Sequence, residues 1–446
     1  MTSRARLLVL PVPLLVLTIG LAACGGDGAD PGKEHEGSAA GASRGWVGGE
    51  PDWSGDSSGD DLDRAEGVTP SMAPDAVPPG PPGPPGTPGP SDGPLRAGNV
   101  DDNAAYPAYL RYLDRIGDLG ERLRPFDARG RVLVTVTGSD GRPAAGEEVV
   151  VSADGDEVAT LRTTADGTAR FLPGVYGAPV DGRFTVRAGD AETEVEAGEK
   201  AALQVARTGG ADDAVPLDIL FLLDATGSMG DEIDQLKTSI DSVAERVDRL
   251  DGNPDVRFAM TLYRDRGDTF VTSTYDFTDD VEEFRSALSK VKADGGGDYP
   301  EALEEGLAEA LSEPSWRPSG EAVQLVFLVG DAPPQTGRDL QKTYPDSARE
   351  AISRGIKIFP VASSESDDAA EAVFRQLAQA TGARFVFLSY GAGGAATGEH
   401  SDIDRTDYEE LSLDDLIVRL TAEELAALTG DPGVVPDPDP TTPPTQ

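Results

Sequence analysis

Cysteine and histidine are nearly absent from this chain of 446 residues, which has one cysteine, Cys24, and two histidines, His35 and His400. A single cysteine excludes an intrachain disulfide. The same scarcity excludes a histidine-rich zinc site and nearly excludes catalysis by a cysteine–histidine pair. Basic residues are also few, with 38 Lys and Arg against 80 Asp and Glu and a net charge of −42. Because so acidic a chain repels nucleic acid, no nucleic-acid partner is expected.

Large apolar side chains are scarce in residues 25–100, which consist largely of Gly, Ser, Asp and Pro. Such a segment buries too little surface to offset the entropy lost on ordering, so we predict a disordered tether over 24–100. Residues 80–89 have a collagen-like period, but four triplets are too few for a triple helix and favour a polyproline II spacer. Residues 430–446, rich in Pro and Asp, are predicted to form a disordered tail.

The N-terminus has an apolar run from Leu7 to Leu21, preceded by two arginines. The run is short for a transmembrane span and typical of a signal peptide. It ends in Leu21-Ala22-Ala23-Cys24, which resembles a bacterial lipobox, where the cysteine is lipidated and becomes the mature N-terminus. The resemblance implies a signal peptide over 1–23, acyl chains such as palmitate on Cys24, and a place on the extracytoplasmic face of the cell membrane.

Two segments of different periodicity follow the tether. Apolar residues at helical spacing predict an amphipathic helix within 104–125. From residue 131 onward, short alternating strands separated by Asp-Gly pairs predict a small all-β sandwich over 131–207. Residues 164–171 resemble carboxypeptidase-regulatory or immunoglobulin-like (Ig-like) modules of bacterial surface proteins. That resemblance implies a spacer or binding role.

Strands and helices alternate after Val215. Leu217–Leu223 and Val323–Val329 are near-continuous apolar runs, as expected for parallel strands that are covered on both faces. The alternation predicts an α/β fold with a doubly wound, mostly parallel sheet over 216–390, including a helix over 299–312. A loop and a final helix are predicted over 391–429.

Polar side chains stand in the loops that follow two strands of this predicted sheet. Asp224, Thr226 and Ser228 place one carboxylate and two hydroxyls on alternate residues, and Asp331 follows the second apolar strand. Ligands of such sheets bind beyond the carboxyl ends of the strands. Oxygen ligands of this kind suit a hard divalent cation, Mg²⁺, Ca²⁺ or Mn²⁺.

This combination of Asp-x-Thr-x-Ser after an apolar strand and a later strand-end Asp resembles the metal-ion-dependent adhesion site of von Willebrand factor type A (VWA) domains. The resemblance implies that Thr226 and Ser228 coordinate the cation through their hydroxyls. It also implies that Asp224 and Asp331 bind it directly or through water. An open position would accept a carboxylate from a partner protein, so the resemblance implies a binding protein, not an enzyme.

One loop departs from the family pattern. The family usually supplies a threonine after two glycines, whereas this chain reads Gly295-Gly296-Gly297-Asp298. We expect Asp298 to replace the missing ligand. A third carboxylate would hold the cation more firmly but leave it less attractive to a partner's carboxylate. Alternatively, Asp298 merely caps a helix that begins at Tyr299.

Two other functions stay open. Ser228, Asp331 and His400 follow the chain order of an α/β-hydrolase triad, and the strand-turn-helix around Ser228 is like a nucleophile elbow. In such a serine hydrolase Asp224 and Thr226 would have no task, whereas the metal site uses both. The second alternative is a structural surface protein whose site binds no metal.

Overall fold

The computed structural model describes residues 95–120, 122–206, 214–251, 253–297, 299–337, 340–363, 366–390, 403 and 411–428. Cys24, Asp298, His400, the predicted signal peptide and the tail 430–446 lie outside these ranges, as does the tether up to residue 94. No helix within the described ranges is both long enough and apolar enough to span a bilayer.

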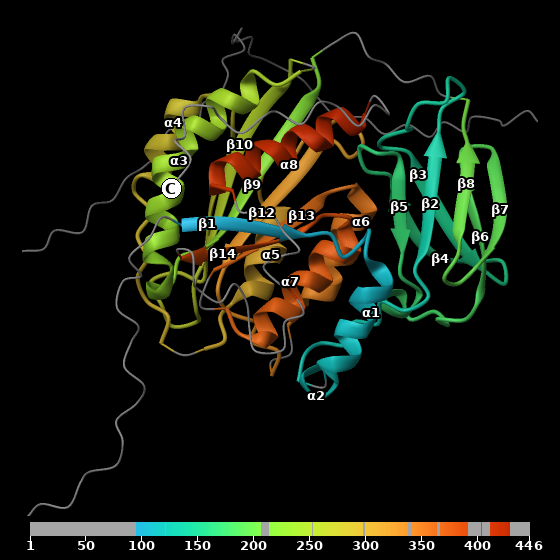
Figure 1. Ribbon diagram of the computed structural model, residues 1–446, viewed down its shortest axis with the longest axis horizontal. Helices are drawn as coiled ribbons and strands as arrows, with labels where there is room; N and C mark the ends of the chain where they lie inside the picture. The colour runs from blue at the N-terminus through green and yellow to red at the C-terminus, as the bar shows by residue number, and fades with distance from the viewer. Residues whose placement is uncertain are drawn as a thin grey trace, which may run out of the picture. The chain divides into compact units, whose positions relative to one another are not determined.

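A seven-stranded sheet forms the centre of the C-terminal half (Figure 1). Its strand order is β1-β14-β13-β12-β9-β10-β11. The strands are β1 (Leu95–Val100), β9 (Pro216–Asp224), β10 (Asp255–Tyr263), β11 (Thr272–Thr278), β12 (Val323–Gly330), β13 (Lys357–Ala362) and β14 (Phe385–Tyr390). The five inner strands run parallel, and the two edge strands, β1 and β11, pair antiparallel. The predicted mostly parallel sheet is confirmed.

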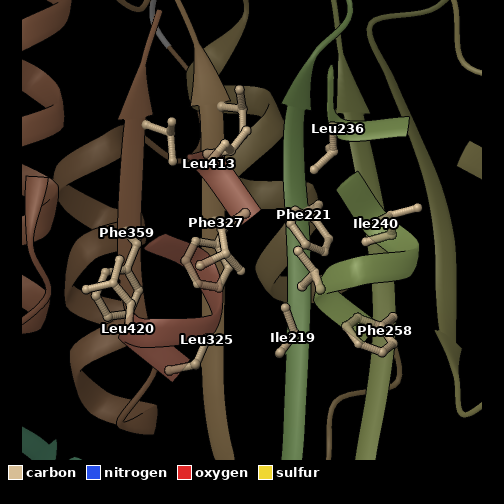
Figure 2. Close-up of a cluster of buried hydrophobic side chains, with 14 of the residues drawn as sticks. Ile219, Phe221, Leu236, Ile240, Phe258, Leu325, Phe327, Phe359, Leu413 and Leu420 are labelled. Carbon is tan, nitrogen blue, oxygen red and sulfur yellow. The ribbon is translucent and has the colours of Figure 1, made fainter. Parts of the chain in front are cut away.

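Helices cover both faces of this sheet. One face carries α3 (Gly230–Asp248), α4 (Val281–Leu288) and α8 (Leu413–Ala427), and the other carries α5 (Leu303–Ser312), α6 (Tyr344–Arg354) and α7 (Asp368–Thr381). Phe221 of β9 packs in the same cluster as Leu236 of α3 and Leu420 of α8 (Figure 2). Its neighbours Leu220 and Leu222 point to the opposite face and join the second cluster. Both faces of β9 are therefore buried, which explains its continuous apolar run.

The predicted β-sandwich is present between residues 132 and 204. One sheet has the order β5-β2-β8 and the other β4-β3-β6-β7. The strands are β2 (Val132–Thr137), β3 (Glu148–Ala153), β4 (Asp156–Arg162), β5 (Thr168–Phe171), β6 (Arg183–Ala188), β7 (Ala191–Glu196) and β8 (Lys200–Gln204), with the 3-10 turn η1 (Pro173–Tyr176) after β5. Phe171 and Phe184 join the two sheets edge to face, with ring centroids 4.9 Å apart.

The N-terminal boundary differs from the prediction. The predicted tether reaches residue 100, but residues 95–100 form β1, which pairs with β14 from Leu95↔Tyr390 to Val100↔Phe385. Its partner strand is far away in the sequence, so no local pattern could indicate the pairing. The predicted helix within 104–125 is divided into α1 (Tyr106–Arg115) and the short α2 (Gly117–Gly120).

The helix predicted over 299–312 also begins later, at Leu303. The backbone of Glu301 pairs with the loop after β12, because its N–H donates to Pro333 O and its carbonyl accepts from Gln335 N–H, both at 3.1 Å. These bonds hold residue 301 outside the helix. The alternative that Asp298 caps a helix beginning at Tyr299 is therefore wrong, since the residue preceding α5 is Ala302.

Candidate metal centre

The first loop of the site begins at the carboxyl end of β9. Asp224, the last residue of that strand, is fully buried. Its Oδ1 accepts hydrogen bonds from the Thr226 N–H at 3.0 Å and the Thr226 hydroxyl at 2.7 Å. Because this hydroxyl donates its only hydrogen to Asp224, its lone pairs stay available for another group.

Ser228 and Asp331 are the other two predicted metal ligands that the structure describes. Ser228 lies in the 3-10 turn η2 (Gly227–Met229) that leads into α3, and its Oγ is 3.3 Å from Thr226 Oγ1. Asp331 directly follows β12 and is buried. Burial raises the pKa of its carboxyl group, and the adjacent Ser228 hydroxyl opposes that rise. The fold thus brings four of the five predicted metal ligands to one edge of the sheet. The fifth, Asp298, lies outside the described residues.

A glycine loop closes the site from the other side. The Gly227 N–H donates to Gly295 O at 3.2 Å, which holds this loop against the first one. At Gly296, where φ is +74°, a Cβ would lie 2.9 Å from both Glu301 Oε1 and Thr226 Cβ. Only glycine fits there without displacing the site. Gly297 has open space around it, where the family would place its threonine.

Asp268 fixes the shape of this glycine loop. Its Oδ2 accepts from the Gly296 N–H at 3.0 Å and from the Asp265 N–H at 3.2 Å. Asp265 in turn accepts from the side-chain amide of Gln335. These aspartates therefore position backbone segments around the site.

The loops surround an open cavity of about 590 Å³. It is lined by Thr226, Gly227, Ser228, Gly295, Gly296, Gly297, Tyr299, Glu301 and Asp331, and none of these residues is basic. Glu301 is buried, and its Oε2 has no hydrogen-bond partner. Sequence reasoning missed Glu301 because it fell inside a predicted helix. The available signal was Pro300 directly before it, since proline disfavours helical backbone in the preceding residue.

Two buried carboxyl groups of the site, those of Asp224 and Glu301, have raised pKa values. Burial, and then the charge of Asp331, raises the pKa of Asp224 to about 7. Burial, and then the charges of Asp224 and Asp265, raises the pKa of Glu301 to about 8. Asp224 Oδ2 accepts no well-formed hydrogen bond, although the nearby Tyr263 hydroxyl interacts with this carboxylate. Buried, crowded carboxylates of this kind are stabilised by a cation.

A divalent cation fits this donor set. Within the described ranges, no three His, Cys, Asp or Glu side chains lie close enough to hold a metal by themselves. A cation here would therefore depend on the Thr226 and Ser228 hydroxyls as well as on carboxylates. Hydroxyl and carboxylate oxygens are ligands that Mg²⁺, Ca²⁺ and Mn²⁺ accept.

The same geometry does not favour the hydrolase alternative. Ser228 and Asp331 line the same cavity, and the Ser228 hydroxyl is adjacent to the Asp331 carboxylate. In a serine triad a histidine stands between these two groups. The third member of the proposed triad, His400, lies outside the described residues.

Residues 218–391 match the family model of the von Willebrand factor type A domain. The matched region contains the inner strands of the large sheet, apart from the first two residues of β9, and all four residues gathered at its edge. This part of the chain is a VWA domain.

Two curated proteins match parts of the chain. An alpha-protein kinase, vwkA, of Dictyostelium discoideum is 31% identical over 118 residues, which are 26% of this chain and 18% of that protein. A putative ariadne-like RING finger protein, R811, of Acanthamoeba polyphaga mimivirus is 29% identical over 145 residues, or 32% of this chain and 13% of that protein. The match spans less than a fifth of either relative.

Solved structures resemble the chain more distantly. Proximal thread matrix protein 1 of the mussel byssus, with a zinc-occupied MIDAS motif, has 19% identity and a TM-score of 0.31, covering 38% of this chain and 41% of that one. The pilus adhesin SpaC of Lactobacillus rhamnosus GG, in its open conformation, has 12% identity and a TM-score of 0.32. The match covers 56% of this chain and 33% of SpaC.

Proposed function

We propose that this chain is a protein-binding adhesion or scaffold protein whose VWA domain holds a divalent cation, Mg²⁺, Ca²⁺ or Mn²⁺. The observation that carries the proposal is the Asp224–Thr226 pair. The Thr226 hydroxyl donates its hydrogen to Asp224, so the lone pairs of the Thr226 oxygen are left for a cation. Ser228 and Asp331 supply two further oxygens beside it.

Each residue would have a separate task at this site. Thr226 and Ser228 would hold the cation through their hydroxyl oxygens, and Asp331 would hold it directly or through water. Asp224 orients the Thr226 hydroxyl and contributes a buried negative charge. The cation would offer a coordination position toward the cavity, where a side-chain oxygen of a partner protein could bind.

We further propose that the chain is anchored by lipid at Cys24 on the extracytoplasmic face of the cell membrane. The support is the Leu21-Ala22-Ala23-Cys24 sequence after an apolar run, together with the absence of any other cysteine. The part of the predicted tether that precedes β1, residues 24–94, would let the folded part reach a partner away from the membrane surface.

Partner capture from membrane extracts tests the binding proposal. The immobilised full chain should retain one or more proteins in Mg²⁺ or Mn²⁺ and release them in chelator. Thr226→Val should lose this capture, while the matched control Thr238→Val, at an exposed position on α3, should keep it. Capture that is unchanged by chelator and by Thr226→Val would contradict a metal-dependent binding role.

A further inference from the structure

Glu301 brings one more negative charge to the site than the four predicted ligands within the described residues supply. It lines the cavity together with Asp331, and a Cβ on Gly296 would lie 2.9 Å from both its Oε1 and Thr226 Cβ. The remaining oxygen, Oε2, is buried without a hydrogen-bond partner. The carboxylate is therefore held at the site by packing while one of its oxygens stays unused.

The charge of the site can be counted from its side chains. Among the described residues of the site, Asp224, Asp331 and Glu301 carry three negative charges when ionised, against two positive charges on a divalent cation. No basic residue is among the described residues that line the cavity. With the cation bound, the centre would keep a net negative charge in a partly buried setting, where charges are weakly screened.

We propose that Glu301 sets the ligand class of the site, so that the partner protein binds through a neutral oxygen, an amide or a hydroxyl, and carboxylates are rejected. This inference rests on the proposed metal site. An incoming carboxylate would meet a net negative centre and would also lose its own hydration. A neutral oxygen avoids this repulsion and loses less hydration than a carboxylate does.

Tyr299 gives the partner a second point of contact. Among the described residues it is the one large apolar side chain that is well exposed, at 50%. It lies at the cavity, and its hydroxyl approaches the Asp331 carbonyl oxygen at 3.4 Å. Exposed tyrosines are common anchors in protein interfaces. A partner would therefore suit this site if a neutral side chain met the cation and an apolar neighbour packed on Tyr299.

Small probes of equal shape test the proposal on the full chain. Mn²⁺-loaded protein is titrated with acetate and, separately, with acetamide, and the paramagnetic relaxation of the probe's methyl protons reports binding near the ion. The wild type should favour acetamide over acetate. Glu301→Gln should strengthen acetate binding about tenfold and change acetamide binding little. Glu313→Gln, which removes the same charge at an exposed position beyond α5, should change neither.

The outcomes separate the two proposals. Acetate that binds the wild type as well as it binds Glu301→Gln would overturn the role of Glu301, and so would an ion that neither probe reaches. The preference of the wild type is measured without any variant, so a variant that fails to fold leaves that comparison intact. Failure of Mn²⁺ to bind the wild type would overturn the proposed function itself, and this inference with it.

Discussion

The Thr226 hydroxyl donates a 2.7 Å hydrogen bond to Oδ1 of the buried Asp224. This bond orients the hydroxyl so that its lone pairs, and not its hydrogen, are free for a cation. The Thr226 N–H donates to the same oxygen at 3.0 Å and fixes the turn that carries both groups. A cation site at this place depends on this pairing as much as on the charge of the aspartate.

Thr226→Val should therefore weaken divalent-cation binding by at least about tenfold, because it keeps the side-chain shape and removes the hydroxyl. Thr226→Ser should bind nearly as the wild type does, since it keeps the oxygen. Isothermal calorimetry with Mn²⁺ measures both constants. Equal affinity for Mn²⁺ in the valine and serine variants would show that this hydroxyl is not a ligand.

The raised pKa values of Asp224 and Glu301 predict how stability depends on pH in chelator. Both values, about 7 and about 8, lie above the ordinary values of 3.8 and 4.5, so the folded protein holds these protons more tightly than the unfolded chain does. The stability they contribute is complete below the unfolded pKa values and is lost as pH rises through the folded ones. The free energy of unfolding should therefore fall between about pH 4 and pH 8.

A saturating divalent cation should reduce this fall, because the cation takes the place of the bound protons. Urea denaturation at several pH values, with and without Mg²⁺, measures the difference. Parallel pH profiles in the two conditions would contradict a cation bound beside these carboxyl groups.

The sequence predicts the fold and the first loop well because both depend on local patterns. Continuous apolar runs that alternate with helical segments indicate the sheet. The spacing of Asp224, Thr226 and Ser228 indicates ligands on one turn. Glu301 could not be assigned in this way. Its place in the cavity follows from backbone bonds to Pro333 and Gln335, which belong to a loop after another strand.

Strand β1 was missed for a related reason. Leu95–Val100 is short, has no clear alternation and follows a segment rich in glycine and proline. Its strand structure depends on pairing with β14 near the end of the folded region. A buried bidentate bond from Arg375 of α7 to Asp102, at 2.7 and 2.8 Å, holds the residues just after β1. Interactions over such sequence distances leave no local signal.

Two glycines make room for the Tyr263 side chain beside Asp224. A Cβ on Gly330 would lie 2.6 Å from the Tyr263 hydroxyl oxygen, and one on Gly306 would lie 2.8 Å from the ring. Gly330→Ala should therefore lower the free energy of unfolding by about 1–3 kcal/mol. Adding Tyr263→Phe should recover most of this loss, because it removes the hydroxyl oxygen that the new methyl would meet.

Gly306→Ala serves as the control for that rescue. Its methyl would meet the ring, which phenylalanine retains, so Tyr263→Phe should not restore its stability. Urea denaturation of the single and double variants gives the coupling energies. Equal rescue of both alanine variants would argue against a specific contact between Gly330 and the hydroxyl.

Cys24→Ser tests the proposed anchor. If Cys24 is lipidated, the wild type should partition into the detergent phase of a cloud-point extraction, and its N-terminal peptide should carry the mass of acyl chains. The serine variant should stay in the aqueous phase and lack that mass. A wild-type chain recovered without acyl chains from a bacterial host would contradict the lipid anchor.

The most direct test of the metal site is a calorimetric titration of Mn²⁺ into the full chain after chelator treatment. The geometry predicts one bound ion for each chain and its loss, or at least a tenfold weaker affinity, in Asp331→Asn. Asp234→Asn removes the same charge at an exposed position on α3 and should bind as the wild type does. No binding by the wild type, or equal binding in the wild type and both variants, would contradict a cation held by Thr226, Ser228 and Asp331.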